Sequence, residues 1–430
     1  MGLIRNALLG GVKNEDSNYS LTDFEQDFFR YFYGGQKSIA GVAVNEETAM
    51  RFSAVFGCVK IISEDIGMLP IEVRRWRDPK NESKGSDLAF DLPLFDLMKN
   101  QPNPEMNSMV FDETLQSHVL LSGNGYAYKH MDMRGQIVRL QLLDWHSVEP
   151  RRNRDTGAIE YVFRPRQTST TYDTYPPLGA QQVFSFDEIF HIPGLGYNGI
   201  VGYSPIRMAM EAIGLGVASE QFASYFFSNG ANLGGFIETP NKVKDKEAMK
   251  AEFAEKFAGL GKAHKVLFLE EGMKFEKLVM PLREAQFLEG RKFQIEEIAR
   301  IYRMPMHMLQ ELSKATFSNI EHQELAYVKR CLLPWIRRWE LAIDTRLLTR
   351  RQREQGYFAR FAIDEMLRGD SKTRAEVNHV KRQDGVITAN EWRAQDSQNP
   401  REEKEADMLV INGNMREISV VSSTKSVKPT

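Results

Sequence analysis

The chain has 430 residues, a formal net charge of −2 and two cysteines. This length allows more than one hydrophobic core, and the near-neutral charge argues against a protein that clamps nucleic acid through a dense basic surface. Cys58 and Cys331 lie far apart, which argues against a disulfide framework or a cysteine-rich metal site and fits a reducing compartment. No apolar run reaches the roughly 18 residues that span a bilayer, so no membrane partner is expected.

Residues 1–45 are rich in glycine, asparagine and serine and contain the aromatic cluster FEQDFFRYFYGG. Their apolar patch is too short and too broken for a signal peptide. We expect an N-terminal arm that becomes ordered only against another surface.

Residues 46–204 predict a mixed α+β domain. Apolar residues recur at spacings of three and four before Gly67 and Pro70, which indicates a helix with one buried face. The segment IEVRRW then predicts a strand. The apolar positions of the helix are Val55, Val59, Ile62 and Ile66.

A second helix and a set of strands follow in this domain. Asn107 or Ser108 can cap a helix that runs to about Leu121. The segments YAYKH and IVRLQLL, on either side of RGQ, predict a hairpin, and residues 150–190 predict further strands.

The segment FHIPGLGYNGIVGYSPI contains Gly194, Gly196 and Gly199, a G-x-G-x-x-G pattern after an apolar run. In a dinucleotide site such glycines lie where a strand turns directly into a helix, whose first amides hold the pyrophosphate. Here Ser204 is the expected N-cap and Pro205 the first helical residue, so the glycines lie upstream of the free amides. We interpret them as a flexible loop between a sheet and a helix. A soluble dinucleotide-dependent enzyme built on Gly194–Gly199 is the alternative hypothesis.

The helix predicted from Pro205 to about Phe227 is rich in alanine and glycine, which lets helices approach closely within the chain or between subunits. GGFIE then predicts a strand, Lys246–Leu260 a helix, and KVLFLEEGMKFEKLV a hairpin. A further helix ends at Met304–Pro305.

A methionine-rich loop, MPMHMLQELSKATF, precedes a long helix. Ser318 and Glu321 form a capping box at the start of this helix. We expect it to run to about Arg353 and to kink at Pro334, because proline removes a backbone hydrogen bond. The stretch Lys329–Arg360 has nine basic and three acidic residues.

Catalytic patterns are missing from the sequence. The eight histidines form no H-x-x-x-H or H-E-x-x-H pair, and there is no G-x-S-x-G elbow or P-loop. Acidic pairs such as Glu296–Glu297 and Asp364–Glu365 are typical of solvated faces. We therefore predict a protein that is not an enzyme and that needs no metal or other cofactor.

Eight segments occur in one order along residues 50–400. Each is weakly specific alone, but in this order the chain resembles the phage portal protein family, in the large branch found in long-tailed double-stranded DNA phages. The arm and the last thirty residues match nothing in that family. The segments are SAVFGCVKIISEDIGMLPIEV, LMKNQPNPEMNSMVFDETLQSHVLLSGNGYAY, FDEIFHIPGLGYNGIVGYSPI, ASYFFSNGANLGGFIE, VLFLEEGMKF, FLEGRKFQIEEIARIYRMP, ATFSNIEHQELAYVKRCLLPWIRRWE and DGVITANEWR.

The resemblance implies a homo-oligomeric ring, usually of twelve subunits, at one capsid vertex. Such a ring nucleates procapsid assembly, and double-stranded DNA passes through its channel during packaging and ejection. The implied partners are the terminase large subunit, the major capsid protein and scaffold, a head–tail adaptor and the DNA itself. The implied location is the virion, after assembly in the host cytoplasm.

The resemblance also implies a portal-type subunit with a mixed α/β wing, a two-helix stem, a small α/β clip, a long kinked helix and a helical crown. The predicted parts are the N-terminal arm 1–45, the wing 46–204, the first stem helix 205–231, the clip 232–282, the second stem helix 283–303, the tunnel loop 304–317, the long kinked wing helix 318–355, the crown 356–400 and a disordered tail 401–430.

Three sets of residues are implied as contact sites. The tunnel loop would line the DNA channel with a weak and adaptable surface, basic residues near the crown are candidates to face DNA, and clip lysines are candidates to dock the terminase or neck proteins. The loop set is Met306, Met308, Leu309, Gln310, Glu311, Leu312, Ser313 and Lys314; the basic set is Arg346, Arg350, Arg351 and Arg353; the clip set is Lys246, Lys250 and Lys256.

Two of these sets have alternative interpretations. The methionines of the loop can face a local core. The basic residues of Lys329–Arg360 can bridge acidic patches on neighbouring subunits. They can also belong to a basic nucleic-acid-binding protein, whose isolated subunits bind DNA tightly and with strong salt dependence.

Overall fold

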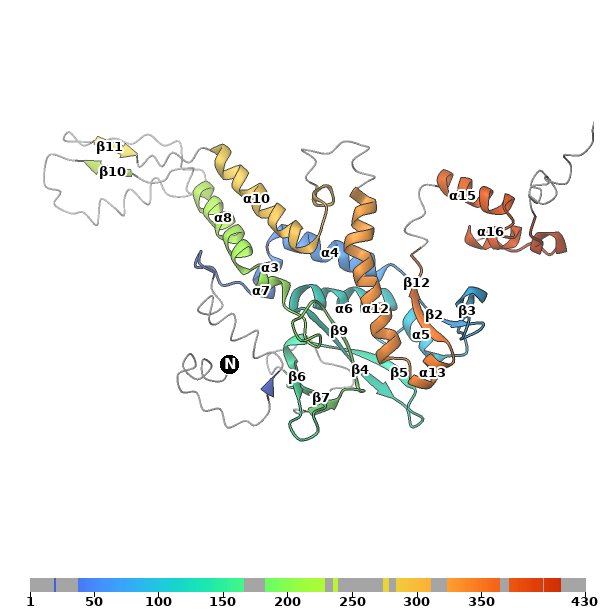
Figure 1. The fold of residues 1–430 in the computed structure, drawn as a ribbon. Coiled ribbons are helices and arrows are strands. Elements are labelled where there is room, and N and C mark those ends of the chain that lie inside the picture. Colours follow the sequence, from blue (N-terminus) through green and yellow to red (C-terminus); the bar gives the residue numbers. More distant parts are fainter. Residues whose placement is uncertain are drawn as a thin grey trace, which may run out of the picture. The chain divides into compact units, whose positions relative to one another are not determined.

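The computed structural model (Figure 1) describes residues 19–20, 38–165, 182–228, 235–238, 274–277, 284–310, 323–363, 371–396 and 398–410. The chain forms two compact units, Met1–Phe361 and Ala362–Thr430. The first contains helices and antiparallel sheets together, which agrees with the predicted α+β class.

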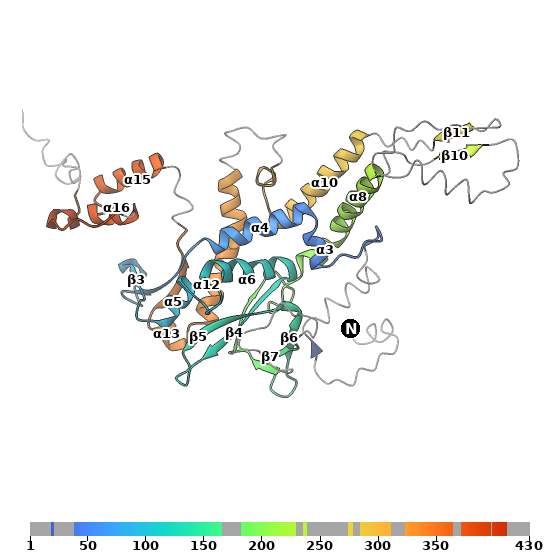
Figure 2. The ribbon, with the colours of Figure 1, turned by 180° about the vertical axis from the view of Figure 1, so that it is seen from behind.

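Two helices form the centre of the first unit. α4 (Ser53–Gly67) packs against α6 (Ser108–Ser122), and both views show the two helices next to each other (Figures 1 and 2). Asn107 caps α6, as predicted, because its side-chain oxygen accepts a hydrogen bond from the backbone N–H of Val110 at 2.9 Å. The predicted apolar face of α4 is buried at all four positions: Val55, Val59, Ile62 and Ile66.

Two antiparallel sheets follow α6. In the first, β4 lies between β5 and β9, which confirms the predicted hairpin. In the second the order is β1-β6-β7-β8, so a short piece of the N-terminal arm pairs with the edge of this sheet. The strands are β1 (Tyr19–Ser20), β4 (Asn124–Met131), β5 (Ile137–Leu143), β6 (Val148–Arg152), β7 (Ile159–Phe163), β8 (Gln182–Ser185) and β9 (Ile189–Pro193).

The core between these sheets is aromatic and aliphatic. Tyr126 of β4, Tyr161 of β7 and Phe184 of β8 are buried in one cluster with Leu143 and Ile189. Inward-facing residues from adjacent antiparallel strands therefore join the two sheets into one hydrophobic core.

A third sheet contains a strand that the sequence assigned elsewhere. β12 (Tyr357–Phe361) pairs with β2 (Ile71–Trp76), which pairs with β3 (Ser86–Leu88), and α5 (Pro93–Lys99) packs against β2. The ring of Phe358 stacks on Trp76 at 4.3 Å between ring centroids. The prediction that a helical crown begins at residue 356 is therefore wrong for this strand, because its apolar residues complete a sheet of the first unit.

Two helices in tandem replace the single helix predicted from Pro205. α7 (Pro205–Met208) is followed by α8 (Met210–Ser228), and the helix is interrupted at Ala209. α8 packs beside α10 (Glu284–Tyr302), as Figures 1 and 2 both show, and Arg291 forms an ion pair with Glu220 at 3.4 Å. A short helix, α3 (Glu46–Met50), precedes α4.

Part of the predicted clip is described by the structure. β10 (Gly235–Glu238) pairs with β11 (Lys274–Lys277) in an antiparallel arrangement, so GGFIE is a strand as predicted. The predicted helix Lys246–Leu260 lies outside the described residues.

The long helix differs from its prediction at its end. The described residues are helical without a break from 323 to 346, because the π-helical turn Val328–Leu332 runs directly into α12 (Leu333–Arg346). Pro334 therefore lies inside the helix, as predicted, and the irregularity beside it is the π-helical turn. The helix ends at Arg346 and not near Arg353. Thr349 then caps a separate helix, α13 (Arg350–Glu354), by a capping box with Gln352. The predicted capping box at Ser318 and Glu321 lies outside the described residues.

The second unit contains α15 (Ser371–Gln383) and α16 (Ala389–Gln395), followed by a 3₁₀ turn, Lys404–Asp407. The side chain of Asn390 bonds to the carbonyl of Arg401 at 2.9 Å and to Asp407 at 2.8 Å. The prediction of a disordered tail from residue 401 is thus wrong for residues 401–410, because these side-chain contacts hold them to the helices. Within the described part of the chain, no helix is both long and apolar enough to cross a membrane.

Candidate functional site

The glycine-rich segment after β9 is a place of close backbone contact. A Cβ on Gly196 would lie 1.8 Å from the carbonyl oxygen of Val201, and one on Gly202 would lie 2.1 Å from that of Gly123. These positions require glycine because main-chain segments touch there. Close approach of main-chain segments explains these glycines without a bound nucleotide.

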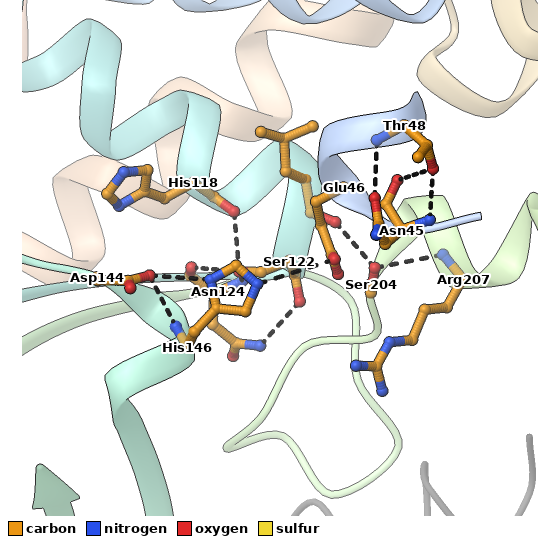
Figure 3. Close-up of polar contacts among 11 residues, drawn as sticks. Asn45, Glu46, Thr48, His118, Ser122, Asn124, Asp144, His146, Ser204 and Arg207 are labelled. Carbon is orange, nitrogen blue, oxygen red and sulfur yellow. Dashed lines mark hydrogen bonds and ion pairs between the residues drawn. The ribbon is translucent and has the colours of Figure 1, made fainter. Parts of the chain in front are cut away.

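The helix that follows this segment is also closed to a phosphate. The Ser204 hydroxyl caps α7 by accepting from the N–H of Arg207 at 3.3 Å, and it donates to the carbonyl of Leu121 at 2.8 Å (Figure 3). The strand before the glycines is antiparallel to β4 and does not belong to a parallel βαβ unit. The dinucleotide-binding interpretation of Gly194–Gly199 is therefore wrong.

A buried hydrogen-bond network holds the glycine-rich segment to the sheets. The Asn124 side-chain oxygen accepts from the N–H of Gly202 at 2.8 Å and from Nε2 of His191 at 3.1 Å. Nδ1 of His191 is then the acceptor for the Tyr161 hydroxyl at 3.1 Å. Burial lowers the pKa of His191 to about 3, so the ring is neutral, and Arg346 beside it acts in the same direction.

A second polar cluster joins α3 to the sheets (Figure 3). His146 lies 3.0 Å from Asp144 and 3.9 Å from Glu46 of α3. His118 of α6 packs edge-on against Trp145 at 4.5 Å between ring centroids, and burial lowers its pKa to about 4. The described residues contain no group of three side chains that could hold a metal ion. Through His146 and Glu46, the cluster connects α3 to the sheets.

The two cysteines are buried in the first unit. Burial raises the pKa of each thiol to about 12, so both stay protonated. The Cys331 thiol donates to the carbonyl of Tyr302 at 3.2 Å. Neither has the lowered pKa of a nucleophile or metal ligand.

The described part of the predicted tunnel loop is a half-buried 3₁₀ turn, Met306–Leu309. Leu309 contacts α4, since a Cβ on Gly57 would lie 3.0 Å from its Cδ2 atom. Gln310 is exposed and has a positive φ of 65°. Leu309 is therefore a local packing residue. Glu311, Leu312, Ser313 and Lys314 lie outside the described residues.

The predicted basic set does not form one cluster. The Arg346 guanidinium lies over the Phe186 ring at 3.3 Å and donates to the Phe186 carbonyl at 3.3 Å. Arg350, Arg351 and Arg353 are exposed on α13, where Arg350 pairs with Glu354 at 2.9 Å. The clip lysines Lys246, Lys250 and Lys256 lie outside the described residues.

Sequence reasoning missed an open basic groove between the end of α10 and the start of the long helical segment. Its volume is about 650 Å³. The only sequence signal was the basic pair Lys329–Arg330 before Pro334; nothing in the sequence placed Arg303 beside that pair. The lining residues are Arg303, Met304, Pro305, Gln323, Ala326, Tyr327, Lys329, Arg330 and Pro334.

Comparison with known proteins gives one consistent result. The family model described as "Phage portal protein" matches residues 53–396. The chain is 32% identical over 382 residues to the probable portal protein of Streptomyces phage phiC31, covering 85% of this chain and 79% of that protein. It is 31% identical over 365 residues to the portal protein of Enterobacteria phage HK97, covering 83% and 81%.

Solved structures share the fold. A chain in the neck of a native gene transfer agent particle, computed with C12 symmetry, has a TM-score of 0.52 at 18% identity and covers 83% of this chain and 94% of its own. An HK97 family phage portal protein from Corynebacterium diphtheriae has a TM-score of 0.52 at 12% identity, with 74% and 95% covered.

Proposed function

Because the chain belongs to the phage portal protein family, we propose that it forms a ring at one capsid vertex and that double-stranded DNA passes through this ring during packaging and ejection. The observation that carries the proposal is the family match over residues 53–396. The family is structural and not enzymatic, so the prediction that the chain is no enzyme is confirmed.

The ring has twelve copies in this proposal, and α8 and α10 form its stem. A neighbour in the gene transfer agent neck was computed with C12 symmetry, which supports this number. α8 and α10 pack together and also carry exposed apolar side chains, such as Leu215 at 49% and Phe293 at 52% exposure. Such faces suit a head-to-tail contact that closes on itself around a ring.

The partners follow from the same role. The terminase large subunit docks during packaging, and a head–tail adaptor replaces it afterwards. The major capsid protein and scaffold surround the ring, which nucleates procapsid assembly in the host cytoplasm and remains in the virion. The clip, 232–282, is the docking part, through Lys246, Lys250 and Lys256.

The mass and symmetry of the purified protein test the ring. Native mass spectrometry and negative-stain imaging should show a ring with a central hole, with a mass near twelve times 49.3 kDa. Co-expression with the scaffold is the second arm, because assembly of portal rings can need it. A chain that stays a compact dimer in both arms contradicts the proposal.

Two variants test the channel and the clip separately. Shortening the segment 308–314 by deletion of Glu311, Leu312, Ser313 and Lys314, which keeps the packing residue Leu309, should reduce DNA packaging or retention while the ring still forms. Unchanged genome filling would remove this loop from the channel. Charge reversal at Lys246, Lys250 and Lys256 should weaken binding of the terminase or adaptor. Unchanged affinity for both proteins would place docking elsewhere.

A further inference from the structure

The π-helical turn before α12 exposes two cations on one side of the helix. Tyr327 and Cys331, four residues apart, are 3% and 2% exposed and face inward. The Tyr327 hydroxyl donates to Asp65 at 2.5 Å, which fixes this orientation. Lys329 and Arg330 lie between them in sequence and are exposed. π-Helical turns inside helices occur frequently at functional sites.

A third cation occupies a backbone position that favours glycine. Arg303 has a φ of 56°, and the N–H of Met304 bonds to the carbonyl of Ala299 at 2.8 Å. This is a Schellman motif at the end of α10, whose left-handed position is usually glycine. An arginine there costs about 1–2 kcal/mol of backbone energy. Glycine would avoid this cost, so we infer that the arginine is kept for a contact of its guanidinium.

The three cations meet at the groove. Pro334 has no N–H to donate to the carbonyl of Arg330, and this carbonyl accepts instead from the Arg303 guanidinium at 3.4 Å. In the described part of the chain, Arg303, Lys329 and Arg330 form no ion pair with a carboxylate. Three positive charges on one groove, without a carboxylate partner among the described residues, attract an anion.

The place of the groove in the chain indicates which anion. Arg303 directly precedes the predicted tunnel loop, and Lys329 lies twelve residues after its end. In the sequence, the two cations therefore flank the loop that the resemblance assigns to the DNA channel. Resting on the proposed function, we propose that Arg303, Lys329 and Arg330 contact the phosphate groups of double-stranded DNA in the channel. Proteins that make 6–10 phosphate contacts hold DNA tightly at low salt; three per subunit give a weaker, salt-sensitive contact.

The test measures binding of the assembled ring to a fluorescent duplex of about 30 base pairs at several salt concentrations. The groove variant carries Arg303→Gln, Lys329→Gln and Arg330→Gln. For each phosphate that the variant no longer neutralises, the slope of log affinity against log salt should decrease by about 0.9. A control removes three exposed loop cations, Lys80→Gln, Arg134→Gln and Arg154→Gln, and should leave the slope unchanged.

Three results would overturn the inference. One is a ring that does not bind the duplex at low salt. Another is an equal salt slope for the groove variant and the control variant. The same conclusion would follow if a variant with glutamine at Arg350, Arg351 and Arg353 showed a larger decrease in the slope than the groove variant. The third is a groove variant that no longer binds a polyglutamate peptide, which the wild-type ring binds, but binds the duplex as the wild type does. The groove would then be a site for an acidic protein.

A single substitution separates the charge of Arg303 from its backbone role. Arg303→Gly relieves the left-handed strain, so the thermal midpoint should be unchanged or higher while duplex affinity falls. Equal affinity would remove Arg303 from the site. Native mass spectrometry of each variant shows whether the ring forms. A ring without the slope change contradicts only this inference, whereas a wild-type chain that forms no ring even when co-expressed with the scaffold contradicts the proposed function.

Discussion

The two ends of the long helical segment carry cations with opposite environments. At the π-helical turn, Lys329 and Arg330 are exposed, without a carboxylate partner in the described part of the chain. Farther along, Arg338 donates to the carbonyls of Pro193 and Gly194, and Arg346 is stacked on Phe186. One basic stretch of sequence therefore supplies both an open surface and partly buried contacts with the sheets.

The C-terminal end is fixed by contacts with the sheets. The Lys129 ammonium donates to the carbonyl of Arg346 at 2.7 Å and satisfies one of the free carbonyls at the end of α12. Burial lowers the pKa of Lys129 to about 8. Glu340 is 5% exposed and accepts from the guanidinium of Arg337 at 3.1 Å and from the N–H of Phe361 at 3.2 Å. Substitutions at this end should therefore change stability, and substitutions at the other end should change binding.

The largest effect is expected for Trp339→Ala. The ring is fully buried, and its Nε1–H donates to Gln116 of α6 at 2.8 Å. The free energy of unfolding should fall by about 3–5 kcal/mol, measured by denaturant unfolding. Trp335→Ala is the matched control, because Trp335 is only half-buried. An equal loss for both would contradict the assigned difference in burial.

Arg346→Met should cost less, about 2–3 kcal/mol, because the substitution removes hydrogen bonds from a charged group and a desolvated cation–π interaction. The same denaturant measurement applies. Arg353→Met on α13 serves as the control and should change stability by no more than about 0.5 kcal/mol. If Arg346→Met changed the free energy of unfolding as little as Arg353→Met, the contacts of Arg346 with Phe186 and Tyr161 would not contribute to stability.

Acid should lower the free energy of unfolding through protonation of His191, which lies beside Arg346 at the C-terminal end of α12. Its pKa in the folded protein, about 3, is below the usual 6.5, so the unfolded state binds the extra proton between these values. The contribution of neutral His191 to the free energy of unfolding is fully present above pH 6.5 and falls as the pH decreases toward 3. The loss between pH 7 and pH 5 should be about 2 kcal/mol, at 1.36 kcal/mol per pKa unit. Burial lowers the pKa of His118 as well, which adds in the same direction.

Denaturant unfolding at several pH values checks this expectation. His191→Gln should make the curve of stability against pH shallower, even if the variant is less stable at pH 7. An unchanged curve would mean that His191 is not buried as a neutral ring.

The smallest effect is expected for Pro334→Ala. The π-helical turn already accommodates the proline, and the carbonyl of Arg330 already accepts from Arg303, so the free energy of unfolding should change by about 0.5 kcal/mol or less. The new N–H would compete with Arg303 for the carbonyl of Arg330. Denaturant unfolding gives the stability, and negative-stain images give the ring geometry. A decrease above about 2 kcal/mol would mean that the π-helical turn depends on proline.

The sequence by itself determined the elements whose signals are local. The apolar spacing predicted α4, Asn107 predicted the start of α6, and Ser204 predicted the start of α7. Periodicity and capping involve residues within a few positions of one another, so they can be read without the fold. The ordered series of segments also indicated the family.

Only the tertiary structure decided those features that depend on contacts between residues far apart in the sequence. Tyr357 pairs with Arg75, which lies 282 residues earlier in the chain, so β12 was assigned to the wrong part. The glycine pattern allowed two interpretations until Gly202 was found against Gly123. Whether a cation is buried or open depends on neighbours such as Phe186, because desolvation and packing are properties of the folded environment and not of the residue type.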